Sequence, residues 1–563
     1  MGRSIIFLLI LALFWGNLLS QDKKSQVAAI LKERGEVYVG LKISTLKSFQ
    51  KPSLLPGFDK IEFDKVFLYL TSKDSVFLAE NLNNLEIQTP ASMQFQVAMS
   101  DDRETVLNGK AYPTYKLYLE IMEYFRDSFP EICTIDTIGY SSNGRLMLAA
   151  RMGKHTFSPG EVPVVFYGST IHGDEPAGYV FMLMLIHHIL SSSDPNVVAL
   201  LENLTIIIHP LINPDGCYFT SNETIYGATR GNARGVDLNR NFPDPQDGPN
   251  PDGNSWQLET VNMMNYHEKF PPGLSANFHG GSEVINYPFD TWSKLHADHE
   301  WFRFVSSEYA GLASSLLAGY MDEFPGGITN GFDWYEIDGG RQDYVTYFLR
   351  GRETTIELSD RKLIPESELL NYWNANREPM LNYLRQAMYG IHGTICDAQS
   401  SKSIAAEVFV IGRDTLNSSI FSDSLHGRFF RYLEEGGYKL KISARGYKDL
   451  ITGEIKVNNY EKNEVSFKLL PLEILPETDS FSIGPNPFLS EFTVFVEMDK
   501  PGTVFFRLYD VFGQVMLNEF ATFPAGYFQY TMKPKLADGI YFLEIMCDDV
   551  KKILRLVKVS SVI

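Results

Sequence analysis

Residues 162–175, VPVVFYGSTIHGDE, join a strand pattern to a polar turn that carries reactive side chains. The apolar run at 162–167 is bounded by turn residues and predicts a buried strand, and the apolar stretch at 179–190 predicts a long helix. A further helix is predicted over 115–129 and a strand over 204–208. Strands that alternate with helices predict an α/β fold, a sheet with helices on both faces.

His172 and Glu175 stand three residues apart on the turn between the predicted strand and helix. At this spacing the two side chains can converge on one metal ion, and imidazole and carboxylate are donors that suit zinc. The pair alone is a weak signal, because a histidine beside a helix-capping glutamate has the same spacing. The hypothesis therefore depends on what else the chain offers.

Three further groups of residues carry candidate chemistry. The segment 230–243 is rich in arginine and side-chain amides, which suits either a solvated loop or a set of donors for a carboxylate and an oxyanion. His279 follows Phe278 at a predicted strand end. Glu357 lies among apolar neighbours at 354–359, where burial would raise its pKa toward a value useful for a general base.

Together these groups resemble the zinc metallocarboxypeptidases, specifically their N/E-like regulatory branch, over about residues 106–470. The resemblance implies a carboxypeptidase-like α/β fold, a mixed twisted sheet with helices on both faces. It also implies one Zn²⁺, at which zinc-activated water attacks the C-terminal peptide bond of peptides or proteins. The residues it implies are the zinc ligands His172, Glu175 and His279, the general base Glu357, the oxyanion-stabilising Arg230, the carboxylate-binding pair Asn239 and Arg240, and the capping Tyr335.

The same resemblance predicts a preference for C-terminal Lys or Arg, because Asp290 and Gln342 match positions at which this branch recognises basic residues. One position departs from the pattern: Arg341 stands where the branch usually has an apolar residue. A guanidinium pointing into the pocket would offset Asp290. Asp237 is a candidate to hold a zinc-bound imidazole by its other nitrogen.

The composition limits the classes of function. The chain has 563 residues and a net charge of −19, so several domains are expected and nucleic-acid binding is not supported. The four cysteines have no paired or metal-ligand spacing and are interpreted as packing residues. The remaining histidines of the predicted domain are interpreted as non-ligands; they include His187, His188, His209, His267, His296 and His299.

The N-terminus favours export. Arg3 precedes an apolar run at 5–15 and a polar switch after Ser20, a pattern that predicts a signal peptide over 1–20. The alternative is a membrane anchor, but the run is shorter than the ~20 residues that cross a bilayer. No later segment is predicted to span a membrane. Residues 21–105 are expected to form a small α+β accessory or pro-region, with no cluster of assignable chemistry.

Two small all-β sandwich domains are expected after the catalytic domain at 106–388. Alternating strands at 389–472, with turns predicted at Gly436-Gly437 and Asn458-Asn459, resemble the transthyretin-like domain that follows the catalytic domain in this branch. Residues 477–563, with motifs at 484–488, 508–514 and 538–542, resemble a type IX secretion sorting domain. That resemblance implies a Gram-negative bacterium, contact with its secretion machinery, and a secreted or cell-surface protein. The alternative for 477–563 is an ordinary β-sandwich binding module.

Two rival functions remain open at the level of sequence. A zinc deacylase of N-acyl amino acids shares the His-x-x-Glu…His site, although Asn239, Arg240 and the Trp334-Tyr335 pair argue against it. A non-catalytic surface protein with a peptidase fold is the rival from another class. It is the weaker one, since every required side chain is present.

Overall fold

The computed structural model describes residues 22–46, 55–155, 160–472, 480–498, 500–547 and 550–560. These residues divide into two compact units, Met1–Pro471 and Leu472–Ile563. The predicted signal peptide lies outside the described residues. Within them, no helix combines the length and the apolar character needed to cross a membrane.

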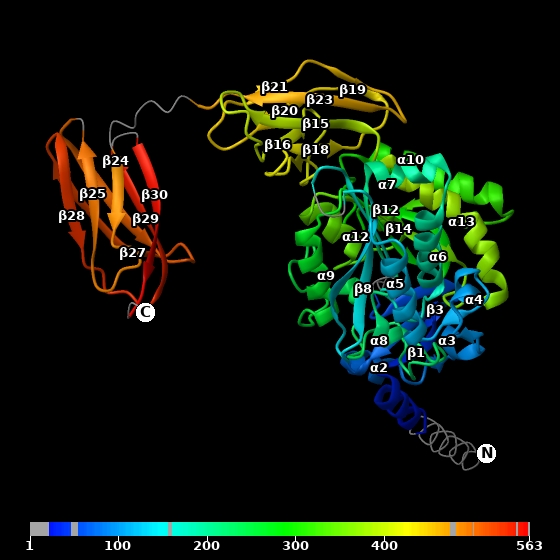
Figure 1. Ribbon diagram of the computed structural model, residues 1–563. Helices are drawn as coiled ribbons and strands as arrows, with labels where there is room; N and C mark the ends of the chain where they lie inside the picture. Colours follow the sequence, from blue (N-terminus) through cyan, green and yellow to red (C-terminus); the bar gives the residue numbers. More distant parts are fainter. Residues whose placement is uncertain are drawn as a thin grey trace, which may run out of the picture. The chain divides into compact units, whose positions relative to one another are not determined.

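The centre of the first unit is an eight-stranded mixed sheet (Figure 1). Pairing is parallel between β9 and both of its neighbours, β10 and β11, and antiparallel toward β8 and β7 at one edge. In spatial order the strands are β13 (Ile328–Asn330), β12 (Ser282–Tyr287), β14 (Arg352–Ser359), β11 (Leu274–His279), β9 (Val164–Ser169), β10 (Thr205–His209), β8 (Leu146–Met152) and β7 (Cys133–Tyr140).

Helices cover both faces of this sheet, as the sequence predicts. Val165 and Tyr167 of β9 pack into one apolar core, whereas Val164 and Phe166 pack into another, because successive side chains of a strand point to opposite faces. The first core contains side chains of α5 (Tyr115–Ser128), α6 (Ala177–Ser191), α7 (Pro195–Asn203), α10 (His299–Leu316) and α13 (Glu366–Gln386). The second contains side chains of α9 (Leu258–Lys269), η4 (Leu238–Arg240) and η6 (Tyr344–Phe348).

The predicted site residues follow the parallel strands. His172 and Glu175 lie on the turn between β9 and α6, and His279 is the last residue of β11. Glu357 of β14 is paired in register with His279. The carboxyl ends of parallel strands meet at one edge of a sheet, where ligands of open α/β folds bind. Short elements complete the domain: α3 (Ala91–Gln94), α4 (Arg103–Leu107), β5 (Met99–Ser100), β6 (Tyr112–Pro113), α8 (Pro214–Cys217), η5 (Pro325–Gly327), α11 (Gly331–Trp334) and α12 (Arg341–Asp343).

The N-terminal segment has the α+β character that the sequence predicts. Residues 22–34 are helical, and a four-stranded sheet of order β2-β3-β1-β4 follows with its own apolar core. Strand β2 is an outer strand of that sheet. The elements are β1 (Glu36–Lys42), η1 (Ile43–Thr45), β2 (Phe58–Glu62), β3 (Lys65–Thr71), η3 (Ser72–Asp74), α2 (Ser75–Asn81) and β4 (Leu85–Ile87).

The regular secondary structure of residues 390–469 consists of strands, which form three small sheets around a shared apolar core. The turn predicted at Gly436-Gly437 is wrong: both glycines pair with β22 as part of β19. The strands are β15 (Gly390–Asp397), β16 (Glu407–Val410), β17 (Ile420–Phe421), β18 (Arg428–Arg431), β19 (Gly436–Tyr438), β20 (Leu440–Ser443), β21 (Leu450–Ile451), β22 (Ile455–Val457) and β23 (Lys462–Leu469).

A buried ion cluster joins these strands to the catalytic part of the chain. Asp298, at the start of α10, accepts hydrogen bonds from Arg352 of β14 and from Arg413 and Arg431 of the sandwich. Arg431 also binds Asp414. A buried carboxylate requires such partners, because an unpaired charge inside a protein is costly. The sandwich is therefore fixed to the catalytic part by specific contacts.

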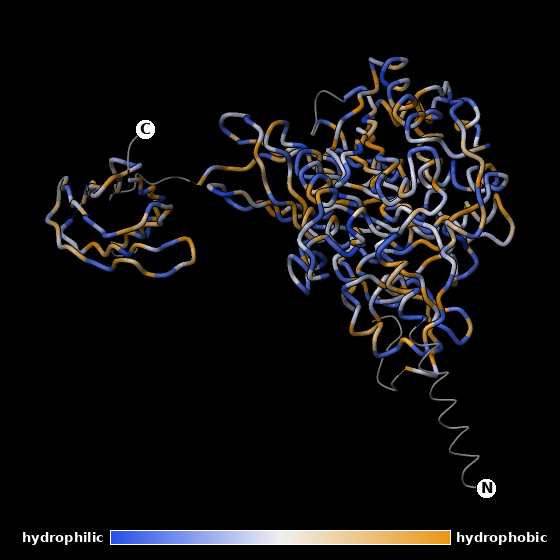
Figure 2. The backbone as a smooth tube through the Cα atoms, turned by 90° about the horizontal axis from the view of Figure 1, so that it is seen from below, coloured by the Kyte–Doolittle hydropathy of each residue, from blue (hydrophilic) through white to orange (hydrophobic). Residues whose placement is uncertain are grey.

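The second unit consists of two antiparallel sheets, of order β24-β25-β28 and β27-β26-β29-β30. Hydrophobic and hydrophilic residues alternate along its strands (Figure 2). The buried hydrophobic residues form a core of their own. The strands are β24 (Ser480–Gly484), β25 (Phe492–Met498), β26 (Gly502–Tyr509), β27 (Val515–Phe523), β28 (Gly526–Met532), β29 (Gly539–Cys547) and β30 (Val550–Lys558).

Candidate active site

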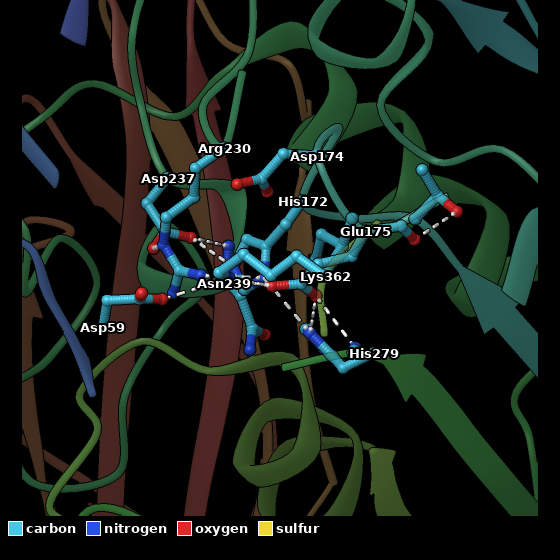
Figure 3. Close-up of polar contacts among 12 residues, drawn as sticks. Asp59, His172, Asp174, Glu175, Arg230, Asp237, Asn239, His279 and Lys362 are labelled. Carbon is cyan, nitrogen blue, oxygen red and sulfur yellow. Dashed lines mark hydrogen bonds and ion pairs between the residues drawn. The ribbon is translucent and has the colours of Figure 1, made fainter. Parts of the chain in front are cut away.

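Three predicted metal ligands converge at the carboxyl edge of the central sheet (Figure 3). Each of His172, Glu175 and His279 offers one ligand atom, and these atoms all lie within 4.8 Å of one another. Nδ1 of His172 is 3.0 Å and Nδ1 of His279 is 2.9 Å from the Glu175 carboxylate. All three side chains are buried. Two imidazoles and one carboxylate form the donor set of a catalytic zinc site, with room for a further ligand.

The other imidazole nitrogens face polar groups that can orient the rings. Nε2 of His172 lies 3.0 Å from Oδ1 of Asp237, the contact that the sequence analysis anticipated. Nε2 of His279 lies 2.8 Å from the Asn277 amide, whose Oδ1 has no hydrogen-bond partner among the described residues. Turned by 180°, the amide oxygen would accept a hydrogen bond from the N–H of this ring. Burial lowers the pKa of His279 to about 4, so its imidazole is neutral at pH 7, the form that binds metal.

Glu357 lies beside this group as the sequence predicts. It lines the same cavity as the three candidate ligands, and its Oε2 is buried with no hydrogen-bond partner among the described residues. Burial, together with the nearby Glu175 carboxylate, raises the pKa of Glu357 well above its ordinary value. An unpartnered carboxylate with a raised pKa is suited to exchange protons with a water or substrate.

Asp237 organises the basic side of the site. Nε of Arg230 donates to Oδ2 of Asp237, at 2.9 Å, while Oδ1 accepts the main-chain N–H of Asn239, also at 2.9 Å. Arg240 donates to the carbonyl of Asn239. Arg230, Asn239 and Arg240 all line the cavity with the candidate metal ligands. The cavity therefore places two guanidinium groups and an amide near the candidate metal centre.

Asp290 and Gln342 meet in the structure. Oδ1 of Asp290 accepts hydrogen bonds from Asn286 and from Gln342, each at 2.9 Å. Asp290 lines the cavity, whereas Gln342 does not; Gln342 is linked to the cavity only through its hydrogen bond to Asp290. Burial raises the pKa of Asp290 to about 7.

Arg341 points away from this pocket. Its guanidinium donates to both oxygens of Glu353 at 2.9 Å and to the carbonyl of Ala276 at 3.0 Å. Arg341 is fully buried and does not line the cavity. Arg341, which departs from the pattern of the family branch, is thus paired with the buried carboxylate of Glu353. Its guanidinium does not enter the pocket to offset Asp290.

The cavity has a volume of about 600 Å³. Tyr335 lines it, with its ring centroid 4.9 Å from that of Trp334. The residues that line the cavity include all the predicted site residues except Gln342: His172, Glu175, Arg230, Asn239, Arg240, His279, Asp290, Tyr335 and Glu357. One cavity thus brings together predicted site residues that range from position 172 to position 357.

Sequence reasoning missed a second set of residues at this site. Lys362 donates to Oε1 of Glu175 at 2.5 Å and forms an ion pair with Asp59 at 3.1 Å. Tyr69 donates to Asp174, the neighbour of Glu175, at 2.8 Å. Lys362 lies only five residues after Glu357, which is a usable signal, but nothing in the local sequence of Asp59 indicates its position. The sequence of residues 21–105 shows no cluster of assignable chemistry, but Asp59 and Tyr69 of this segment contact residues of the candidate site.

The cysteines and the remaining histidines lie outside the candidate metal centre. All four cysteines are free thiols. The groups of side chains placed to hold a metal among the described residues contain no histidine besides His172 and His279.

Comparison with known proteins gives similarity over most of the first unit. A family model described as zinc carboxypeptidase matches residues 118–379. Carboxypeptidase D of Drosophila melanogaster is 32% identical over 393 residues, covering 66% of this chain and 28% of that protein. The carboxypeptidase N catalytic chain of Homo sapiens is 33% identical over 379 residues, covering 60% of this chain and 81% of that protein. The chain thus spans little more than a quarter of carboxypeptidase D.

Among solved structures, the carboxypeptidase A from Helicoverpa armigera aligns with a TM-score of 0.49 at 17% identity. The alignment covers 63% of this chain and 97% of that one.

Proposed function

Because the chain belongs to the zinc carboxypeptidase family, we propose that it removes single residues from the free C-termini of peptides or proteins. The observation that carries this proposal is the shared cavity, which combines a His₂Glu donor set, an unpartnered carboxylate at Glu357 and the Asn239–Arg240 pair. The last pair favours an exopeptidase, because amide and guanidinium donors can bind a terminal carboxylate by charge-assisted hydrogen bonds.

His172, Glu175 and His279 would hold the zinc ion that the family requires. When bound, zinc supplies Lewis acidity, which polarises a carbonyl and lowers the pKa of water from ~15.7 toward ~7. Asp237 orients the His172 ring and Asn277 lies against the His279 ring. Such contacts fix the ring orientation and the tautomer that binds metal.

The side chains of the cavity divide the remaining work of hydrolysis. Glu357 takes a proton from the attacking water and returns it to the leaving amine. Arg230, held by Asp237, stabilises the negative charge that develops on the carbonyl oxygen. Asn239 and Arg240 bind the terminal carboxylate, and Tyr335 closes the cavity over the terminal residue. These three residues, the carboxylate clamp, give no support to the deacylase alternative.

We propose in addition a preference for C-terminal Lys or Arg, which is supported by the buried Asp290 carboxylate in the cavity and by Arg341 being committed to Glu353. A cationic side chain there would stabilise the ionised form of Asp290. Replacing Asp290 by Asn keeps the shape of the side chain and removes the charge. We expect kcat/KM for Lys-ending peptides to fall by about 10- to 100-fold relative to Leu-ending ones.

One experiment tests both proposals: digestion of a peptide library by the zinc-loaded protein, read by mass spectrometry. Loss of one residue from the C-terminus is expected, with Lys and Arg lost fastest, and the D290N variant should lose that ranking. Gln342→Asn is the matched change at the hydrogen-bond partner, with a smaller expected effect. Release of internal fragments, or hydrolysis only of N-acyl amino acids, would contradict the exopeptidase assignment.

We also propose that the protein is secreted or attached to the surface of a Gram-negative bacterium through a type IX sorting domain at 477–563. The supporting observations are the N-terminal sequence pattern and the separate, all-β character of the terminal unit. Residues 389–472 would be a transthyretin-like support for the catalytic domain, anchored through Asp298.

Removing residues 477–563 is expected to leave the enzyme in the periplasm of a bacterium with type IX machinery, while the intact chain leaves the cell. Immunoblots of the culture medium and cell fractions measure this. Equal export of both forms would show that the terminal unit is a binding module and not a sorting signal.

A further inference from the structure

The cavity of the active site has a wall that comes from the N-terminal segment. Ala91 and Gln94 of α3 line the cavity. The residues of the N-terminal sheet that line it are Tyr38, Phe58, Asp59, Lys60, Ile61, Glu62 and Tyr69. They belong to β1, β2 and β3, so the catalytic domain alone does not enclose the cavity. Every residue of β2 takes part in the wall.

The wall is held against the candidate metal centre by ionic contacts. Asp59 forms an ion pair with Lys362 at 3.1 Å, and Lys362 binds the Glu175 carboxylate (Figure 3). The Asp59 side chain is only 5% exposed, and its Oδ2 also accepts a hydrogen bond from Tyr38. Contacts between buried charges are strong and specific in geometry. They fix the distance between β2 and the site of the reaction.

Further contacts hold the segment at points away from β2. The carboxylate of Glu36 accepts the main-chain N–H groups of Arg230 and Gly231, at 3.1 and 3.3 Å. Arg34 donates to the carbonyl of Gly227 at 3.0 Å. These bonds clasp the loop that carries Arg230, so the segment is attached to the catalytic domain on several sides.

The wall adjoins the candidate metal centre, because Lys362 joins Asp59 to Glu175. A terminal carboxylate at Asn239 and Arg240 places the bond to be cut near Glu175 and Glu357. The residues before that bond then meet the next groups beyond Glu175, which are Lys362 and Asp59. Phe58, the neighbour of Asp59, also contacts the capping Tyr335, with ring centroids 5.0 Å apart.

The enclosed volume is small but not filled. About 600 Å³ remains with all the predicted catalytic side chains on its surface, a volume typical of pockets that hold a drug-sized molecule. We infer that the N-terminal segment makes the active site a chamber for short peptides, with Phe58 and Asp59 of β2 setting the length limit. This inference rests on the proposed carboxypeptidase activity. It gives the segment a role in substrate selection, distinct from a plug that blocks all substrates.

A ladder of peptides tests the inference on the full-length, zinc-loaded protein. The peptides share the same last two residues, ending in Lys, and extend from about two to twelve residues. We expect kcat/KM to fall by about tenfold or more from four to twelve residues, because longer chains must displace the wall. A change of less than about twofold across the ladder would overturn the length limit. Absence of hydrolysis even for the shortest peptides would instead overturn the proposed function.

The matched variants are Phe58→Ala and Phe63→Ala, on the same β2–β3 hairpin. Phe63 is fully exposed and does not line the cavity, so F63A should keep the wild-type ratio of short- to long-peptide kcat/KM. F58A should reduce that ratio by about fivefold or more. An equal rise for every peptide length in F58A would show an inhibitory plug and overturn the inference. The wild-type ladder decides the question by itself if F58A does not fold.

Discussion

Replacing Glu357 by Gln is expected to lower kcat for the shortest Lys-ending peptide by about 10²- to 10⁴-fold, the usual contribution of a general base. The amide has nearly the shape of the carboxylate but cannot accept a proton from water at neutral pH. The unpartnered Oε2 of Glu357 and the raised pKa of this carboxyl are the observations behind the expectation. Steady-state kinetics measure the change, with the zinc content of the variant determined in parallel.

Glu283→Gln is the matched control for this variant. Glu283 lies on β12, next to β14 in the sheet, and does not line the cavity, so the same chemical change there should leave kcat within about twofold. Zinc-loaded E357Q that keeps the wild-type kcat would exclude Glu357 as the base and would favour a different mechanism or a non-catalytic role for the domain.

Loss of the metal is expected to have the second large effect. Replacing His279 by Ala leaves two protein ligands where a catalytic zinc needs three. We expect bound zinc to fall from about one ion per chain to near zero after dialysis, and hydrolysis to fall below detection. Elemental analysis and peptide hydrolysis measure the two losses independently. A chelator should reproduce both effects in the wild-type protein, and added Zn²⁺ should reverse them.

His188→Ala is the control for a lost imidazole. His188 lies on α6 and belongs to no group of candidate metal ligands among the described residues. H188A should therefore retain zinc and activity. Full zinc content in H279A would contradict the assignment of His279 as a ligand, whatever its activity.

Much of the fold followed from local pattern. The β9–turn–α6 unit was predictable because an apolar run between turn residues and a long apolar helix leave few other conformations for residues 162–191. The sequence failed at Gly436-Gly437, where glycine normally indicates a turn. The pairing with β22 supplies hydrogen bonds that the local preference of glycine does not reveal.

The candidate site was likewise predictable from the sequence only in part. The spacing of His172 and Glu175 on one turn was local, and the resemblance to a family added His279, Glu357 and the residues of the clamp. The direction of the Arg341 side chain was not predictable, because it depends on Glu353, a buried partner on a separate strand. Whether Arg341 would oppose Asp290 was thus a question that only packing could answer.

By itself, the sequence of this protein determined the types of the reactive side chains, the order of strands and helices that carries them, and the family to which they belong. The tertiary structure alone decided that Asp59 and Lys362, some three hundred residues apart, lie together at Glu175. The physical reason is that an ion pair between segments with different apolar cores depends on how their surfaces fit, and no periodicity in either segment records that fit.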